Sequence, residues 1–294
     1  MDMRDQEQSR NVEDVRGQGG GFRPIHGVSL GTLAIALIGG YFLGINPMTI
    51  LGLLSGGGLD GGQGAPMQQN APANPNTPDP QAADVKFVSQ ILRSTEQVWS
   101  AQFQQLGRTY EEPTLILFRD SYPTGCGTGD AAAGPFYCPN DHKVYLDLSF
   151  FDLMTQRLHA PGQFAHAYVI GHEVGHHVQN LLGTIPKVDA ARQRASQAQS
   201  NALSVRLELQ ADCYAGVWAK LAQSQNGWRL EQGDVETALN AAQQIGDDTL
   251  ARNAGQAVVP DSFTHGTSEQ RVTWFKRGFD SGNPKNCDTF SANP

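Results

Sequence analysis

The stretch Val169–Asn180, VIGHEVGHHVQN, places three histidines and one glutamate in an otherwise apolar run. His172 and His176 are four residues apart, so on a helix their side chains differ in direction by only about 40° and can converge on one ion. Glu173 lies beside that face, whereas His177 is turned by about 140° from His172 and is not expected to reach the same ion. The H-E-x-x-H spacing is typical of zinc hydrolases whose glutamate is the general base.

The alternative is a helix whose histidines are merely exposed or satisfied within the core. That alternative must also explain Gly175, because a glycine inside a helix costs about 1 kcal/mol relative to alanine. The glycine predicts that a strand or the backbone of a crossing helix packs closely against this position. Several titratable side chains in so apolar a helix are costly unless a cation or hydrogen bonds compensate them, which favours a metal site.

Catalytic zinc usually takes three protein ligands and keeps a further position for water, so the chain should offer one more ligand. The extended motif, with a third ligand histidine a few residues later, is absent, because VQNLLGTIP follows His177. The segment 205–216, VRLELQADCYAG, instead supplies Glu208 in an apolar context and Asp212 one turn later. We expect Glu208 to be the third ligand and Asp212 to accept the other ring N–H of a ligand histidine. The alternative is that both are solvated acids on a helix, with Arg206 as a partner for Glu208.

The chain resembles the bacterial neutral zinc metallopeptidases, a membrane-anchored family. The segments that carry the resemblance are SRNVEDVRG (9–17), GPFYCP (134–139), VYLDLSFF (144–151), AYVIGHEVGHHVQNLLG (167–183), LELQADCYAGVWA (207–219) and FTHGTSEQRVTWFKRG (263–278). The wider layout, H-E-x-x-H followed by E-x-x-x-D, is similar to that of the gluzincin class. The resemblance implies a zincin-like domain with the same roles for His172, His176, Glu208, Glu173 and Asp212.

A further histidine, His265, lies in the phrase THGTSEQR. Membrane-bound gluzincins carry a similar T-H-P phrase with an arginine six residues later, and Arg271 stands at that offset, although Gly266 replaces the proline. Under this resemblance, His265 would donate a hydrogen bond to the developing oxyanion or orient the site, with Arg271 behind the ligands. The alternative is a histidine that only fixes its loop.

The composition excludes one class of partner. The chain has 294 residues and a formal net charge of -8, with a pI near 5.4 and no Lys/Arg-rich block. A nucleic-acid binder would need a basic footprint, so we expect no nucleic-acid partner.

The segment 28–54 is almost wholly apolar and long enough to cross a bilayer, which takes about 20 apolar residues. Four arginines precede it and the next basic residue is Lys86, so the Lys/Arg bias predicts a cytoplasmic N-terminal segment at 1–27 and a domain outside the inner (plasma) membrane. A cleaved signal peptide is the rival interpretation, but the long, acid-containing leader and the distant A-x-A at 71–73 disfavour it.

The four cysteines fit an oxidising compartment. Three pairings are possible, and we prefer Cys126 with Cys138 and Cys213 with Cys287, because the second bridge would then hold the C-terminal tail on the body. Structural zinc is less favoured, since no C-x-x-C spacing occurs.

Residues 55–83 are rich in Gly, Pro, Asn and Gln and predict a flexible linker to a single domain at 84–294. Apolar periodicity in that domain predicts helices over 84–106, 150–158, 162–182, 189–222, 234–245 and 267–278. Gly183 and Pro186 are expected to end the helix over 162–182. Strands are expected at 114–118 and 144–148. The fold class is therefore α+β, predominantly helical, with a small sheet.

The function that these features predict is a membrane-anchored, zinc-dependent metallopeptidase that hydrolyses peptide bonds of a peptide or protein substrate, with Zn²⁺ as cofactor. An extended substrate could add a strand to the sheet edge, which we expect near 144–148. Two alternatives stay open: a zinc-stabilised extracytoplasmic binding module without turnover, and a zinc hydrolase of a non-peptide bond.

Overall fold

The centre of the sheet is strand β2 (Thr114–Phe118), the apolar run TLILF. It pairs in parallel with β1 (Val12–Asp14) on one side and with β6 (Lys143–Asp147) on the other. Strand β5 (Phe136–Cys138) pairs antiparallel with β6 and ends the order β1-β2-β6-β5. The computed structural model describes residues 1–3, 6–17, 79–224 and 228–291, and structural statements refer to these residues.

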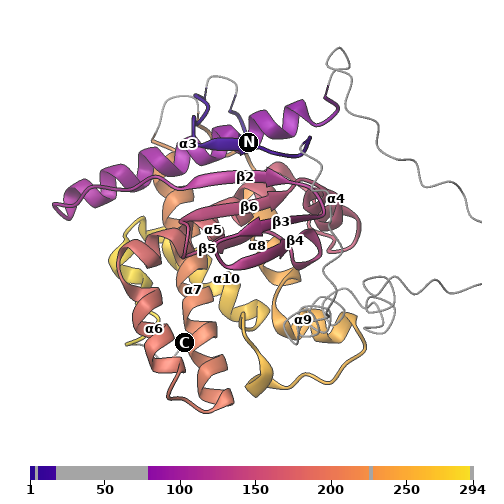
Figure 1. Ribbon diagram of the computed structural model, residues 1–294, viewed down its shortest axis with the longest axis vertical. Helices are drawn as coiled ribbons and strands as arrows, with labels where there is room; N and C mark the ends of the chain where they lie inside the picture. Colours follow the sequence, from indigo (N-terminus) through magenta and orange to yellow (C-terminus); the bar gives the residue numbers. More distant parts are fainter. Residues whose placement is uncertain (4–5, 18–78, 225–227, 292–294) are drawn as a thin grey trace, which may run out of the picture.

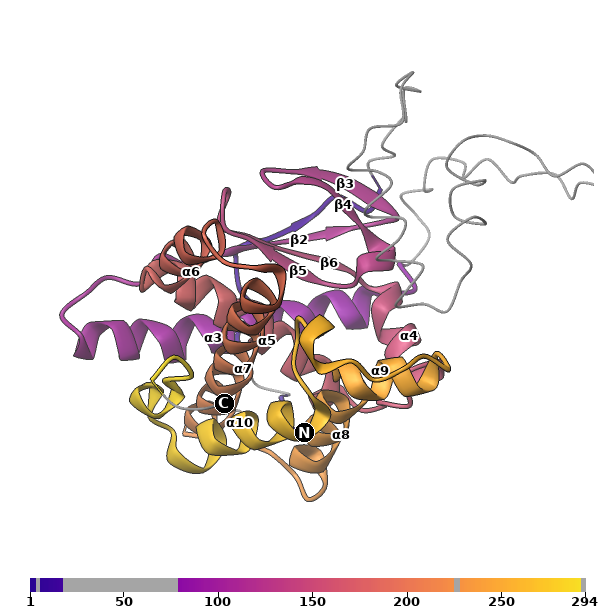
Figure 2. The ribbon, with the colours of Figure 1, turned by 90° about the horizontal axis from the view of Figure 1, so that it is seen from below.

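Both faces of β2 are covered, which explains its unbroken apolar run. Side chains alternate between the faces of a strand, so Leu115 and Leu117 join the main helical core while Ile116 and Phe118 join a second, smaller cluster. A hairpin of β3 (Ser121–Thr124) and β4 (Gly127–Asp130) lies on the side of this smaller cluster. Figure 2 shows the hairpin on one face of the sheet and the helices on the other.

The helices form the remaining layers (Figures 1 and 2). They are α3 (Ala82–Gln105), α4 (Ser149–Gln156), α5 (Gln163–Leu181), α6 (Thr184–Arg192), α7 (Gln197–Ala222), α8 (Asp234–Gln244), α9 (Asp247–Asn253) and α10 (Ser268–Ser281), with short 3₁₀ turns at Ala131–Ala133, Pro260–Ser262 and Pro284–Cys287. In Figure 2, α3 and α5 lie next to the sheet, α7 follows, and α10 and α8 lie farthest from it. Helix α5 is therefore enclosed by other elements, as its apolar sequence requires.

Most expected elements are present, and the predominantly helical α+β class is confirmed. The helix expected over 189–222 is wrong, because the chain forms α6 and α7 with a break between them. Ser196 caps the N-terminus of α7 in a capping box with Gln199, and apolar periodicity does not report this helix start. Gly183 follows the end of α5 in the left-handed conformation, as expected, whereas Pro186 lies in the first turn of α6, where its missing N–H costs no hydrogen bond.

The sheet edge expected at 144–148 is also wrong. Strand β6 covers 143–147 and is paired on both sides, with β2 and with β5. Among the described strands, β5 and β1 are the outer ones of this sheet. The short run Phe136–Cys138 gave no strand signal because it is only three residues long and follows a Gly-Pro pair.

The first residues of the chain differ from the expected division into domains. Residues 12–14 are strand β1 of the domain's own sheet, so the folded body includes both the N-terminal residues and the chain from 79 onward. The anchor expected at 28–54 and most of the linker expected at 55–83 lie outside the described residues; α3 begins at Ala82, inside the expected linker. Within the described part of the chain, no helix combines the length and the apolar character that a membrane crossing needs.

The preferred disulfide pairing is present. Cys126 is bonded to Cys138, and Cys213 is bonded to Cys287. The second bridge joins α7 to the tail that follows α10, as the sequence analysis expected.

Candidate metal centre

Two crossing helices supply the centre. Helix α5 carries His172, Glu173 and His176, and α7 carries Glu208 and Asp212. The helices approach closely at Gly175, where an added Cβ would stand 3.0 Å from the carbonyl oxygen of Ala211 in α7. The crossing helix expected from this glycine is therefore present.

The three expected ligands meet in space. One ligand atom each of His172, His176 and Glu208 can be chosen so that all lie within 4.8 Å of one another. The Nε2 atom of His172 lies 3.1 Å from Oε2 of Glu208, and Nε2 of His176 lies 3.5 Å from Oε1 of the same carboxylate. Two imidazoles and one carboxylate form a donor set that catalytic zinc commonly uses.

The outer hydrogen bonds aim both imidazoles at the same point. Nδ1 of His172 lies 2.9 Å from Asp212, and Nδ1 of His176 lies 2.8 Å from Oε1 of Gln179. A carboxylate and an amide oxygen can only accept, so each ring donates its Nδ1–H outward and turns Nε2 toward Glu208. Lone pairs of two rings and one carboxylate then converge, and a cation is what stabilises such an arrangement. The residues therefore fit a zinc ion.

The pKa shifts of His172 and Glu208 also indicate that the site favours a bound positive charge. Burial lowers the pKa of His172, but the carboxylates of Asp212 and Glu208 outweigh this and raise it to about 10. Burial raises the pKa of Glu208, but the two histidines bring it well below its ordinary value. The site thus holds Glu208 ionised and attracts a proton or a metal ion between the rings.

Asp212 is the centre of a buried network. Its carboxylate is fully buried and accepts hydrogen bonds from His172, from the Tyr168 hydroxyl at 2.5 Å and from the Arg271 guanidinium at 2.9 and 3.0 Å. Burial raises the pKa of Asp212, yet Arg271 and His172 lower it to about 2. Arg271 therefore lies where the sequence analysis expected it, behind the ligands. Tyr168 was missed as a site residue, although its position one turn before His172 was a usable signal.

Glu173 is buried beside the ligands and lines the cavity over them. Burial raises the pKa of its carboxyl group, and the two neighbouring histidines only partly oppose this. A carboxylate with a raised pKa is a better proton acceptor near neutral pH.

His265 also lines this cavity. Its Nδ1 lies 3.1 Å from Asp247, and the same carboxylate accepts the backbone N–H groups of Thr264, His265 and Gly266. Burial lowers the pKa of His265, but Asp247 raises it above its ordinary value. Asp247 was missed because it follows α8, 18 residues before His265, and no spacing rule links the two.

His177 turns away from the ligands. Its Nε2 lies 2.6 Å from the carbonyl oxygen of Glu111, so this nitrogen carries the proton, and Nδ1 must accept from the Tyr137 hydroxyl at 3.0 Å. Asn180 donates a further hydrogen bond to the same hydroxyl oxygen. His177 and Asn180 thus connect the metal-binding helix to Tyr137 on the edge strand β5.

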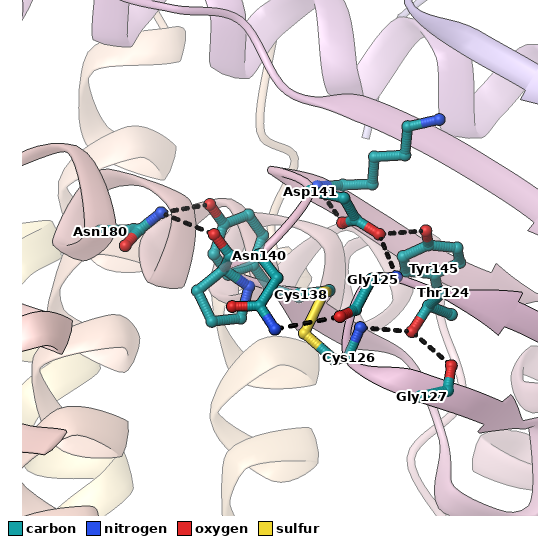
Figure 3. Close-up of a disulfide and its surroundings, with 12 residues drawn as sticks. Thr124, Gly125, Cys126, Gly127, Cys138, Asn140, Asp141, Tyr145 and Asn180 are labelled. Carbon is teal, nitrogen blue, oxygen red and sulfur yellow. Dashed lines mark hydrogen bonds between the residues drawn. A yellow bond between two sulfur atoms is a disulfide. The ribbon is translucent and has the colours of Figure 1, made fainter.

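The disulfide Cys126–Cys138 holds the other side of β5 (Figure 3). It joins the strand to the turn between β3 and β4, and the Asn140 amide donates to the Gly125 carbonyl beside it. Asp141 accepts from the backbone of Gly125 and from the Tyr145 hydroxyl, while Asn180 of α5 points toward the strand from the opposite side. The edge strand therefore has a fixed position relative to the ligands.

The cavity over the ligands has a volume of about 490 Å³. One wall is apolar and comes from α4, the end of α8 and α9; its residues include Phe150, Leu153, Leu158, Ile245 and Leu250. Val169 lies one turn before His172 on the same helix face and joins this wall to the ligands. The lining also includes Gly134, Pro135, Phe136 and Tyr137 of the edge-strand region.

Comparison with known families agrees with this geometry. The chain matches the family described as "Putative neutral zinc metallopeptidase" over residues 1–290 and belongs to that family. Membership of this family supports zinc as the metal of the site and peptidase activity as the general class of reaction. The match includes β1, so the family model also spans the N-terminal residues that pack on the domain.

Two relatives show how far the similarity extends. The protein "Uncharacterized protein YpfJ" of Escherichia coli (strain K12) is 50% identical over 291 residues, which covers 96% of each chain. "Uncharacterized protein Rv2575" of Mycobacterium tuberculosis (strain H37Rv) is 41% identical over 216 residues, covering 70% of this chain and 72% of the relative. No solved structure matches the chain.

Proposed function

We propose that this protein is a membrane-anchored, zinc-dependent metallopeptidase that hydrolyses peptide bonds with Glu173 as the general base. The observation that carries the proposal is the convergence of the His172, His176 and Glu208 donor atoms beneath an open cavity. The expected anchor lies at 28–54, outside the described residues.

Zinc held by these three residues would lower the pKa of a water molecule and polarise a substrate carbonyl. Glu173 is the residue placed to take the proton of that water, since it lies in the cavity wall beside His172 and its carboxyl pKa is raised by burial. The same carboxyl group can return the proton to the leaving amine.

His265 is the candidate donor to the developing oxyanion. Asp247 holds its ring through Nδ1, and His265 lines the cavity. The raised pKa favours the protonated ring, which is the better hydrogen-bond donor. The Arg271 guanidinium donates two hydrogen bonds to Asp212, and it would act on the site through that carboxylate.

The substrate would lie along β5. This strand borders the cavity, and its second edge has no partner among the described strands, so an extended peptide can pair with it there. The apolar wall beyond Val169 would then receive a bulky apolar side chain next to the scissile bond.

The test is a digest of an unbiased peptide library by the purified full chain, together with its zinc content. We expect Glu173→Gln to retain zinc and to cut at least about 10²-fold more slowly. The matched control is Glu269→Gln, an exposed acid in the first turn of α10, which should behave as the wild type. Equal cleavage by Glu173→Gln would remove Glu173 from the mechanism.

The same measurements address the two alternatives. A binding module would retain zinc and gain thermal stability from it but cut no peptide at all. A hydrolase of another bond would also leave the library intact, yet it should turn over activated esters in a Glu173-dependent way.

A further inference from the structure

The described N-terminal residues, 1–3 and 6–17, contact the folded body at several places. The N-terminal ammonium group lies 2.6 Å from Glu231 and 2.9 Å from Asp234, and the backbone of Asp2 exchanges two hydrogen bonds with Arg229. These three partners precede or begin α8, more than two hundred residues later in the chain. The N-terminus is thus held by residues more than two hundred positions away in the sequence.

The next residues form hydrogen bonds with buried polar side chains of α3. The Gln90 amide donates to the backbone carbonyls of Met3 and Gln6. The carboxylate of Glu96, which is only 1% exposed, accepts from the Ser9 hydroxyl and the Asn11 amide. Arg93 of the same helix also pairs with this carboxylate, and Ser9 and Asn11 supply its remaining hydrogen bonds, so the N-terminal residues complete the partners of a buried charge on α3.

Residues 12–14 then enter the sheet as β1, in register with Leu115, Ile116 and Leu117 of β2. At the end of β1, the Arg16 guanidinium lies 2.6 Å from Asp14 and 2.6 Å from Asp79, and it also donates to Gln81. Arg16 and Asp79 are 63 residues apart in the sequence. Residues 16 and 79, which flank the part of the sequence that the structure does not describe, are therefore in contact.

We propose that residues 1–16 and the body from 79 onward lie on the same side of the membrane, and that the surface around the Arg16–Asp79 ion pair faces the bilayer. The described chain stops at residue 17 and resumes at residue 79 beside this ion pair, and the sequence between them contains the apolar segment 28–54, whose composition fits a lipid bilayer. A single crossing would separate β1 from β2 by the thickness of the membrane. This topology replaces the cytoplasmic N-terminus expected from the arginine bias.

The same contacts bear on the cleaved-signal interpretation. Cleavage after 54 would detach β1 from the rest of the chain, and β2 would lose its parallel partner and Glu96 its hydrogen bonds from Ser9 and Asn11. The two disulfides are typical of an extracytoplasmic compartment, so we place the body there, and with it the N-terminus.

The test uses single cysteines at two exposed, uncharged positions of the full chain: Gln8→Cys before β1 and Gln104→Cys near the end of α3. Neither change alters the arginine count on which topology depends. Intact cells are treated with a membrane-impermeant maleimide, and permeabilised cells report the maximum labelling of each variant. The wild type, whose four cysteines are paired, is the control for background.

We expect both cysteines to react to the same fraction of their maximum in intact cells. Protection of one position and labelling of the other would overturn the proposal. Protection of both would agree with residues 1–16 and the body lying on the same side of the membrane, but it would overturn the placement of that side outside the cytoplasm. The readout is independent of zinc and of turnover, so it stands or fails separately from the peptidase proposal.

Discussion

Gly175 of α5 lies directly against the backbone of Ala211 in α7, and this contact sets the separation between the two histidines and Glu208. An alanine at 175 would gain about 1 kcal/mol of helix propensity. Its Cβ, however, would stand 3.0 Å from the Ala211 carbonyl oxygen and 3.1 Å from its Cα, both backbone atoms that cannot rotate away. We expect Gly175→Ala to lower the free energy of unfolding by about 1 to 3 kcal/mol and to weaken zinc binding, because the helices must move apart.

Chemical denaturation and zinc titration measure these two effects. Gly17→Ala is the matched control, since a Cβ at that position meets nothing within 4 Å. A Gly175→Ala protein that was more stable than the wild type would show that helix propensity outweighs the contact.

Asp212→Asn tests the network behind the ligands. The amide would present N–H donors to Arg271 or His172, both of which already donate to this position. We expect zinc affinity to fall by about 10-fold to 100-fold. Isothermal titration with zinc checks this, and Asp189→Asn, an exposed acid of α6, should leave the affinity unchanged.

His177→Ala separates the third histidine of the motif from the metal. It leaves the Tyr137 O–H without its acceptor and the Glu111 carbonyl without its donor, so we expect the free energy of unfolding to drop by about 1 to 3 kcal/mol. Zinc content should stay at the wild-type level, whereas His176→Ala should lose zinc. Loss of zinc from a folded His177→Ala protein would contradict the assignment.

The two disulfides should differ in their contribution to stability. They close loops of 12 and 74 residues. Chain entropy then predicts about 2.8 kcal/mol for Cys126–Cys138 and about 4.5 kcal/mol for Cys213–Cys287. Paired alanine variants compared by urea unfolding measure the difference. A larger loss from the shorter loop would mean that its main contribution is to hold β5 in place.

The Asp247–His265 pair predicts a pH dependence. Burial lowers the pKa of His265, but Asp247 raises it overall, so its stabilisation is complete below the ordinary histidine value and is lost as pH rises through the raised value. Burial raises the pKa of Asp247, but His265 lowers it overall, so this contribution is lost as pH falls through the lowered value. We expect the stability difference between wild type and Asp247→Asn to be larger at pH 5 than at pH 9. A difference that does not change with pH would show that only the backbone hydrogen bonds of Asp247 matter.

The sequence by itself determined the features that depend on local geometry. The four-residue spacing of His172 and His176 determined their shared helix face, and the glycine between them predicted a close crossing. The capping box at Thr267 and the apolar run of β2 likewise follow from neighbours along the chain. Helical period, strand period and caps are short-range properties, so a single sequence reports them.

Only the tertiary structure decided which distant residues meet. It brought Glu208 to the histidines across 36 residues, placed Asp247 against His265 and made β5 rather than β6 the strand beside the cavity. It also inserted residues 12–14 into the sheet, where arginine counting had suggested a separate cytoplasmic segment. Strand pairing and helix crossing depend on the packing of the whole chain against itself, and neither leaves a periodic signal in the segments that it joins.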